Sequence, residues 1–373
     1  RKRVTMEVYA QGIGIVGGFG TGIETFSKTL AHGLSKKQNL TVKTPEGLRD
    51  MTAYLADTSS LEAFVQKKTL RRMDHYSRMA LLGSYLALED AGALDNDRSR
   101  LGIVVASGYG ASRSTYAFLD SFIGGNDAFS SPTHFSNSVH NAAAANISIT
   151  LGVTGPCLTV TQFEMSVPSA LISAIEWLKE ERVDKVLLGA VDEYCDLLGH
   201  CWYRLHGYRD GIGMDPLLFH EQTAILGEGA VFFLLSHEGG ARTPYGKIID
   251  VNIQCTGGFD CPDTHQAVFI LGADGNKAWG HRYEKHLTEE MKVVAYTPLY
   301  GSFPSNMAFD MAAGFLSLRN QGLFPLPAGC SCPSSFNVIR EEQALEVGKI
   351  CCLKLAGDGE SGIITIARDS SSG

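Results

Sequence analysis

The sequence predicts an α/β fold in which helices cover both faces of layered β-sheet. Apolar segments of strand length alternate with amphipathic helical segments along most of the chain. With 373 residues, 44% of them hydrophobic, the chain can bury a large core. The alternation starts again after residue 240, so we expect a first half over residues 1–240 and a shorter second half over residues 241–373.

The first half opens with a glycine-rich segment, Gly12 to Gly20, which we expect to form a turn after a short strand. Arg71 to Gly92 is predicted as a helix, because its apolar residues recur at helical spacing and Gly92 can end it. Leu101 to Ala106 is a continuous apolar run, which predicts a buried strand.

A second helix is predicted from Val167 to Glu181, where the apolar residues form one stripe. Ser166 is the expected N-cap, and Pro168 fits the first turn. The remaining predicted elements are strands at 185–190, 229–236, 247–252 and 363–367 and a helix at about 307–318. The last four residues, 370–373, are expected to be disordered.

Composition excludes several classes of function. The net charge of −8 argues against binding to nucleic acid or to an anionic membrane surface. No apolar run reaches the roughly 18 residues that span a bilayer, and the first residues lack the apolar core of a signal peptide. We therefore expect a cytoplasmic protein without a membrane span.

No cofactor or metal is expected. The nine cysteines lack the CxxC spacing typical of zinc sites, so we expect reduced and mostly buried thiols. Residues 12–17 match GxGxxG, a weak dinucleotide signal, but Lys36 and Lys37 stand where an acidic residue would bind the ribose. Close backbone packing is the favoured interpretation of these glycines, and a dinucleotide-binding oxidoreductase stays open as an alternative.

The most informative segment is residues 155–166 (GPCLTVTQFEMS), which predicts a strand, a sharp turn and the start of a helix. Other motifs accompany it: LRRMD at 70–74 with ALEDAG at 87–92, GVTGP at 152–156 and LGEGA at 226–230. In this order and spacing they resemble the β-ketoacyl synthase family of the thiolase superfamily. The resemblance implies a duplicated, five-layered α-β-α-β-α fold with a contracted second half.

In that family, condensation uses a cysteine at a helix N-terminus, two histidines, a lysine and backbone N–H groups that stabilise an oxyanion. Carried over position by position, the cysteine falls on Glu164 and the first histidine near Ala273. The lysine falls on Thr297, the second histidine on Ser302, and the late glycine loop on residues 357–362. Because every catalytic side chain is replaced, we expect no condensing activity.

Within the family, this pattern is similar to the chain-length-factor (ketosynthase β) subunit of type II polyketide or aryl polyene synthases. The resemblance implies a non-condensing subunit that pairs with a competent ketosynthase, stabilises it and shapes the acyl channel in polyketide, polyene or fatty-acid-like biosynthesis. Such subunits usually carry glutamine at the cysteine position, so Glu164 is a departure. The acyl carrier protein is acidic like this chain, so we expect it to dock mainly on the partner.

Tyr109, Ser112 and Tyr116 fall on the channel-lining positions of the resemblance, and bulky side chains there would shorten the channel. The two tyrosines can equally be core residues of a subunit interface. Three interpretations of Glu164 stay open. It is a carboxylate stabilised at a helix N-terminus, by up to about 1–2 kcal/mol, a plug of the former acyl site, or the active group of a malonyl-carrier-protein decarboxylase.

Overall fold

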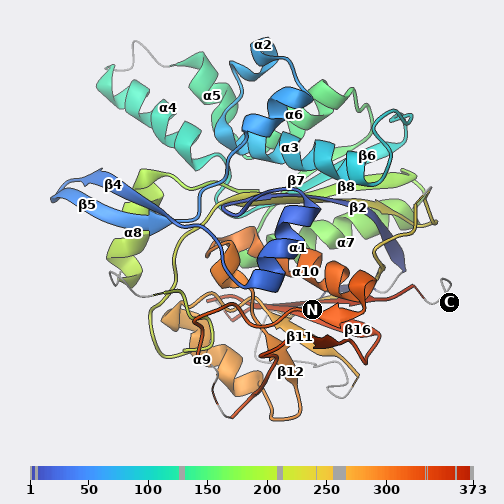
Figure 1. The fold of residues 1–373 in the computed structure, drawn as a ribbon. Coiled ribbons are helices and arrows are strands. Elements are labelled where there is room, and N and C mark those ends of the chain that lie inside the picture. Colours follow the sequence, from blue (N-terminus) through green and yellow to red (C-terminus); the bar gives the residue numbers. More distant parts are fainter. Residues whose placement is uncertain are drawn as a thin grey trace.

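Two β layers enclose a middle layer of helices, and further helices cover both outer faces, as Figure 1 shows for the computed structural model. The structure describes residues 2–4, 7–125, 131–207, 213–240, 242–254, 266–331, 333, 335–357 and 359–369. The five layers confirm the expected α-β-α-β-α fold.

The first β layer has five main strands. They are β2 (Val8–Gly17), β6 (Leu101–Ser107), β7 (Cys157–Thr161), β8 (Lys185–Asp192) and β9 (Gly229–Ser236). Their order is β7-β6-β8-β9-β2, in which β6 runs parallel to β7 and β8, and β9 runs antiparallel to β8 and β2. The short β3 (Gly20–Thr21) pairs with the end of β2.

The second β layer repeats this arrangement. Its strands are β10 (Lys247–Gln254), β11 (Val268–Leu271), β12 (Lys292–Val294), β16 (Lys349–Leu355) and β17 (Ser361–Ala367). They lie in the order β12-β11-β16-β17-β10, with the same parallel and antiparallel pairs as in the first layer. An antiparallel pair of β2 and β10 joins the two layers. The repeated strand order shows the duplication, and the division at residue 240 stays a prediction.

The middle layer consists mainly of two helices. α7 (Ser166–Lys179) contacts β6 and β8 on one side and β10 and β17 on the other, and α10 (Met307–Asn320) contacts β16, β17 and β9. α10 is buried from Met307 to Leu318 because both β layers cover it. Beside them lies α1 (Ile23–His32). On the outer faces, α3 (His75–Asp90) and α6 (Ala142–Leu151) cover the first layer and α9 (Lys277–His286) covers the second.

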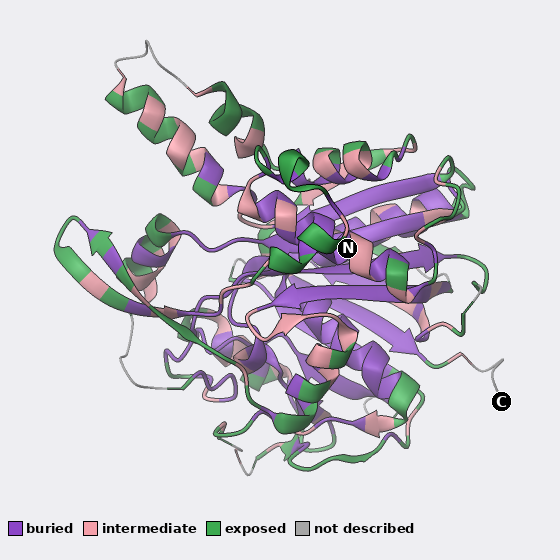
Figure 2. Cartoon of the chain, turned by 45° about the horizontal axis from the view of Figure 1, so that its top comes forward, coloured by how far each residue is buried: buried purple, intermediate pink, exposed green. Residues whose placement is uncertain are grey.

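Two arms extend from this body, as Figures 1 and 2 show. One consists of α4 (Ser112–Gly124) and α5 (Pro132–Ser138). The other is the hairpin of β4 (Gln38–Thr44) and β5 (Gly47–Ala53), which packs on α8 (Asp196–His206). Smaller elements are η1 (Ser59–Ala63), α2 (Lys67–Leu70), and the strands β1 (Lys2–Val4), β13 (Gly322–Leu323), β14 (Asn337–Val338) and β15 (Gln343–Ala344).

The glycine-rich segment is a strand, so its prediction as a turn is wrong. Gly12 and Gly14 lie inside β2, and the chain turns only after Gly17. A Cβ on Gly14 would overlap the carbonyl oxygen of Gly83, and one on Gly12 that of Ala87. The glycines therefore allow α3 to pack closely on β2. They lie within the strand, whereas the glycines of a dinucleotide-binding motif form the turn between strand and helix.

Two helix starts also differ from the prediction. The helix expected from Arg71 begins at His75, because the carboxylate of Asp74 accepts the N–H of Ser77 (3.2 Å) and caps it. Ser166 is the first residue of α7, and the N-cap is Met165. The buried Ser166 hydroxyl lies within hydrogen-bonding distance of the carbonyl oxygens of Phe163 (2.7 Å) and Ser107 (2.9 Å). Its role is to join α7 to the end of β6.

Two expectations drawn from composition can be compared with the structure. Six free cysteines lie in the described ranges, and only Cys195, Cys351 and Cys352 of them are buried, so the expectation of mostly buried thiols is wrong there. A search of the described residues finds no helix with the length and apolar character of a bilayer span.

We predict that Gly14→Ala destabilises the fold by about 3 kcal/mol or more, because the added methyl group overlaps the backbone of α3. The free energy of unfolding in urea measures this loss. Gly124→Ala is the control, since nothing lies within 4 Å of its Cβ position. Similar losses for both variants would contradict this account of β2.

Candidate functional site

Glu164 lies in a tight turn between β7 and α7. The 3₁₀ turn η2 (Phe163–Met165) connects them, which confirms the predicted strand, turn and helix. Phe163 has a φ of 41°, a conformation that is strained by about 1 kcal/mol or more in non-glycine residues and is common at functional turns. Glu164 is half-buried and lies just before the N-cap of α7, where the N–H groups and helix dipole favour a carboxylate.

The carboxylate of Asp192 joins three segments behind this turn. It is fully buried at the end of β8. It accepts hydrogen bonds from the Ser107 hydroxyl (2.8 Å), from the N–H groups of Gly108 (3.0 Å) and Tyr109 (2.7 Å), and from the N–H of Ser305 (3.0 Å). Desolvation raises the pKa of Asp192, and these donors oppose the rise. The segments after β6 and after Ser302 therefore meet at one place.

The three other catalytic positions of the resemblance lie together in the second half. Ala273, Thr297 and Ser302 are all buried. The Thr297 hydroxyl donates to the carbonyl oxygen of Ala273 (2.6 Å), and the Ser302 hydroxyl donates to Oδ2 of Asp274 (2.6 Å). Both hydroxyl protons are therefore engaged inside the protein, and neither group titrates near neutral pH as a general acid or base must.

Tyr109 lies between these positions and Glu164. Desolvation raises the pKa of Tyr109, and the negative charges of Asp192, Glu164 and Asp274 raise it further. The phenol is therefore neutral and lies within electrostatic range of all three carboxylates.

The two other predicted channel residues lie farther along the chain on α4. Ser112 is the first residue of α4, and its hydroxyl donates to the carbonyl of Tyr109 (3.0 Å). Tyr116 is exposed on the arm. The structure thus places Tyr109 at the site and leaves Tyr116 on an outer surface, and the channel role of all three residues stays a prediction.

The space beside Ala273 is closed. The cavity that Ala273 and Asp274 line has a volume of about 0 Å³. Trp279 and Tyr283 from α9 also line it, and Nε1 of Trp279 donates to Oδ1 of Asp274 (3.2 Å). The described side chains of α9 therefore pack closely against Ala273 and Asp274.

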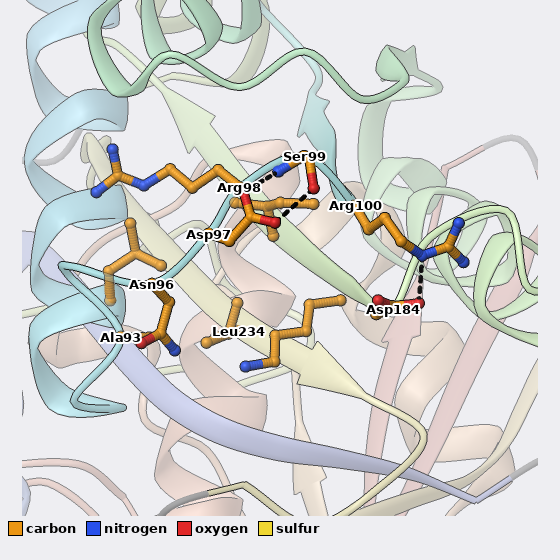
Figure 3. Close-up of a pocket in the computed structure, with 11 residues that line it drawn as sticks. Ala93, Asn96, Asp97, Arg98, Ser99, Arg100, Asp184 and Leu234 are labelled. Atoms are coloured by element: carbon orange, nitrogen blue, oxygen red, sulfur yellow. Dashed lines mark hydrogen bonds and ion pairs between the residues drawn. The ribbon is translucent and has the colours of Figure 1, made fainter.

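A larger cavity, of about 210 Å³, lies at the opposite end of the strands (Figure 3). The residues that line this cavity lie where β6 and β8 begin. Ser107 and Asp192 lie at the opposite ends of the same two strands. Its polar rim is largely occupied by internal contacts, such as the ion pair of Arg100 with Asp184 (2.7 Å). This cavity is therefore separate from the Glu164 site.

The late glycine loop is tied to the Glu164 turn. Nε2 of Gln162 donates to the carboxylate of Glu360 (3.1 and 3.3 Å), and Arg282 donates to the carbonyl oxygens of Ala356 and Gly359. Asp358, which follows the first glycine of this loop, lies outside the described residues.

The LGEGA motif supports the Ser302 segment. The N–H of Ser302 donates to the carbonyl of Ile225 (2.8 Å), and the N–H of Gly227 donates to the carbonyl of Ser302 (3.2 Å). A Cβ on Gly227 would overlap the carbonyl oxygen of Tyr300, so the two backbones can approach only because this residue is glycine.

Sequence reasoning missed a buried cation behind Ala273. Lys354 on β16 is 1% exposed, and its ammonium donates to the carbonyl of Gly272 (2.9 Å) and to Oδ1 of Asn306 (2.9 Å). Nearby, Asp310 on α10 accepts a hydrogen bond from the Tyr300 hydroxyl. Burial raises the pKa of Asp310 to about 7, although that bond and the charge of Lys354 oppose the rise. A lysine inside the apolar run ICCLKLA at 350–356 was the available signal.

Among the described residues, no group of three or more histidine, cysteine or acidic side chains is arranged to hold a metal ion.

The decisive comparison is with a model of known protein families. The model described as "Beta-ketoacyl synthase, N-terminal domain" matches residues 11–238. The chain belongs to the β-ketoacyl synthase family. The matched range includes both the Glu164 turn and the LGEGA motif.

The individual relatives of this β-ketoacyl synthase family member have low sequence identity to it. A "Putative polyketide beta-ketoacyl synthase 1" from Streptomyces virginiae is 27% identical over 246 residues, which cover 62% of this chain and 58% of the relative. A polyketide biosynthesis malonyl-ACP decarboxylase from Bacillus subtilis (strain 168) is 28% identical over 189 residues, which cover 50% of this chain and 45% of that protein. This chain thus spans about half the length of these curated relatives.

A solved structure with the same fold is "The ishigamide ketosynthase/chain length factor". It matches with a TM-score of 0.79 at 16% identity, over 98% of this chain and 100% of that chain. This agreement shows the ketosynthase-type fold along nearly the whole chain, including the second half that the family model does not cover.

We predict that Asp310 makes stability depend on pH. Its pKa rises from 3.8 to about 7 on folding, so its contribution is fully present below about pH 4 and is lost as the pH rises through 7. Between pH 5 and 8 the free energy of unfolding of the wild type should therefore fall by roughly 3 kcal/mol relative to Asp310→Asn. Urea denaturation across this range measures the difference. A constant difference between the two proteins, as expected for the exposed control Asp120→Asn, would contradict the prediction.

Proposed function

We propose that this chain is a non-condensing subunit of the chain-length-factor type in a heterodimeric ketosynthase. The observation that carries the proposal is the engagement of the Thr297 and Ser302 hydroxyls within the protein, at the positions where the family has its lysine and second histidine. With a carboxylate at the cysteine position, the chain also lacks a thiolate that could hold an acyl group as a thioester. Condensation then has to occur on a partner that carries these groups.

The surface around β7 supports a partner of the same fold. β7 is the last strand in the order of its layer, and none of the described strands pairs with its outer edge, as at an edge that can accept a further strand. The neighbouring arm carries exposed apolar side chains, and Figure 2 shows α4 and α5 mostly in the colours of exposed and intermediate residues. These side chains are Tyr116, Leu119, Phe122, Ile123 and Phe135, and together with β7 they form what we name the partner face. Exposed apolar patches of this kind mark protein interfaces.

In this proposal the partner is a competent ketosynthase, and the acyl carrier protein delivers its acyl groups mainly to that partner. The present chain stabilises the partner and limits the length of the acyl channel. The pathway is one of polyketide, aryl polyene or fatty-acid-like biosynthesis.

Co-expression with the ketosynthase encoded nearest to this chain tests the proposal. We expect the two proteins to co-purify, and we expect the pair to condense acyl and malonyl carrier proteins. Glu164→Ala should retain at least about half of this activity, because the residue bears no acyl group, whereas replacing the partner's nucleophilic cysteine should abolish it. Glu164→Cys in the chain alone should not condense, since Thr297 and Ser302 are unchanged. Condensation by the isolated chain, or an acyl adduct on Glu164 seen by mass spectrometry, would contradict the proposal.

The channel assignment has its own test. Ser112→Phe should shorten the products by at least one two-carbon unit while turnover continues, because the ring would occupy space next to Tyr109. Product lengths from the heterodimer are read by mass spectrometry. Ser112→Ala is the control and should leave the product at least as long as the wild type makes. Unchanged lengths with Ser112→Phe would remove Ser112 from the channel.

A second candidate is a malonyl-carrier-protein decarboxylase that uses Glu164. The observation that favours it is the sequence similarity to the malonyl-ACP decarboxylase of Bacillus subtilis. Against it stands the lack of a free acid or base at Thr297 and Ser302, because the enolate that forms needs a donor. Release of carbon dioxide from malonyl carrier protein by the heterodimer distinguishes the two candidates. A large decrease in Glu164→Ala would support the decarboxylase and overturn the passive role.

A further inference from the structure

A cluster of buried ionisable groups lies beneath the first turn of α4, and the proposed function does not use it. Glu193, which is 1% exposed, accepts the N–H of Arg113 through Oε1 (2.8 Å). Its Oε2 is buried and has no hydrogen-bond partner in the part of the chain that the structure describes. Asp74 accepts the hydroxyl of the next residue, Ser114, through Oδ2 (3.3 Å). The buried carboxylate of Glu193 and the half-buried carboxylate of Asp74 therefore hold successive residues at the start of α4.

A buried ion pair lies next to these carboxylates. Nε2 of His75 is 2.8 Å from Oε1 of Glu228, and the two side chains are 22% and 2% exposed. Oε2 of Glu228 accepts the N–H of Tyr194, the residue directly after Glu193 (2.9 Å). Desolvation works to lower the pKa of His75, but the hydrogen bond and charge of Glu228 outweigh it, so the pKa lies above its ordinary value. His75 is thus charged at a pH where a free histidine is partly neutral.

The charges around Glu193 come from all the segments that pack against it. Burial raises the pKa of Glu193 to about 7, and the charge of Asp74 adds to the rise. Arg113 and His75 oppose it, and the largely exposed guanidinium of Arg113 is screened by water. Asp192 faces the other way, toward the N–H groups of Tyr109 and Ser305, and Asp57 lies on the outer side of His75.

These groups respond to pH in the same sense. As the pH rises, Glu193 gains a negative charge around its pKa of about 7 and His75 loses its positive charge, beside the carboxylates of Asp74 and Glu228. A buried site with an excess of negative charge is unfavourable unless water reaches it. The element that covers the cluster is α4. Among the described helices and strands, α4 contacts mainly α5. Its first turn is consequently the part that must move to admit water.

We propose that this cluster couples protonation to partner binding: with Glu193 and His75 protonated, the first turn of α4 is held in place, and their deprotonation loosens α4 and weakens association through the partner face. The identity of the partner rests on the proposed function, whereas the movement of α4 does not. α4 carries Tyr116, Leu119, Phe122 and Ile123 of that face, so a displaced first turn changes the position of these side chains.

The first measurement uses the isolated full chain. Hydrogen exchange of the α4 amides, corrected for the intrinsic effect of pH, should be about tenfold faster at pH 8 than at pH 6 in the wild type. Glu193→Gln imitates the protonated residue and should keep most of the protection at both pH values. Glu180→Gln, on an exposed residue beyond α7, is the matched control and should behave as the wild type. Arg113→Met should move the transition to higher pH, because it removes a charge that favours ionised Glu193. It provides a test if Glu193→Gln does not fold.

The second measurement is the dissociation constant for the co-expressed ketosynthase, which should rise about tenfold from pH 6 to pH 8 in the wild type and stay nearly constant in Glu193→Gln. Exchange in α4 that does not depend on pH in the wild type, or that still depends on it equally in Glu193→Gln, overturns the inference. Binding that is equal at both pH values overturns the link to the partner. If no ketosynthase binds at either pH while α4 exchange follows the expected pattern, the proposed function fails. The inference that protonation of the cluster controls the movement of α4 is then still supported.

Discussion

The buried carboxylate of Asp192 joins the segment that follows β6 to the segment that precedes α10, beside the Glu164 turn. β6 and β8 end side by side, and the backbone N–H groups that follow β6 have no strand partner there. Such groups cost about 1–3 kcal/mol each when they are buried without an acceptor. Asp192 accepts those of Gly108 and Tyr109 and, with its other oxygen, that of Ser305 from the second half. One side chain thereby holds both halves of the chain in register beside the Glu164 turn.

The first half contains the strained turn that carries Glu164, whereas in the second half the hydroxyls of Thr297 and Ser302 are engaged by neighbouring groups of the protein. The turn at Phe163 keeps a strained φ of 41°, a geometry that a plain connection between strand and helix does not need. In the second half, hydroxyls bond to Ala273 and Asp274, aromatic rings of α9 fill the adjoining space, and Lys354 binds the neighbouring carbonyl of Gly272.

Much of this architecture could be predicted from the sequence, because buried strands and amphipathic helices have strong periodic signals. β9 was predicted with its observed limits, and α7 and α10 to within two residues. From the sequence alone, the glycines of β2 are assigned to a turn because the reason for them lies far away along the chain. They leave room for the backbone of α3, and no residue within the segment itself indicates that this helix packs there. Ser166 was misplaced for a similar reason, since one of the carbonyls that its hydroxyl approaches, that of Ser107, lies far away in the sequence.

From the sequence, site positions can be proposed only where a family motif marks them. The assignment of catalytic positions to Glu164, Thr297 and Ser302 stays a prediction, and the hydrogen bonds that engage the two hydroxyls depend on Ala273 and Asp274 across the fold. Lys354, Asp310 and Glu193 were missed because each is an isolated charge within an apolar run or strand end. These charges are notable only because they are buried, and the periodicity of a sequence does not show whether a single polar residue is buried.

The exposed edge of β7 and the apolar arm have a consequence for how such a subunit is produced. A strand edge with free backbone donors and acceptors can pair with any other open strand, including one from a second copy of the same chain. In a proposed heterodimer, surplus copies lacking a companion would be the ones prone to self-association and loss. Matched synthesis of the two polypeptides would then protect the chain better than high expression of this one alone.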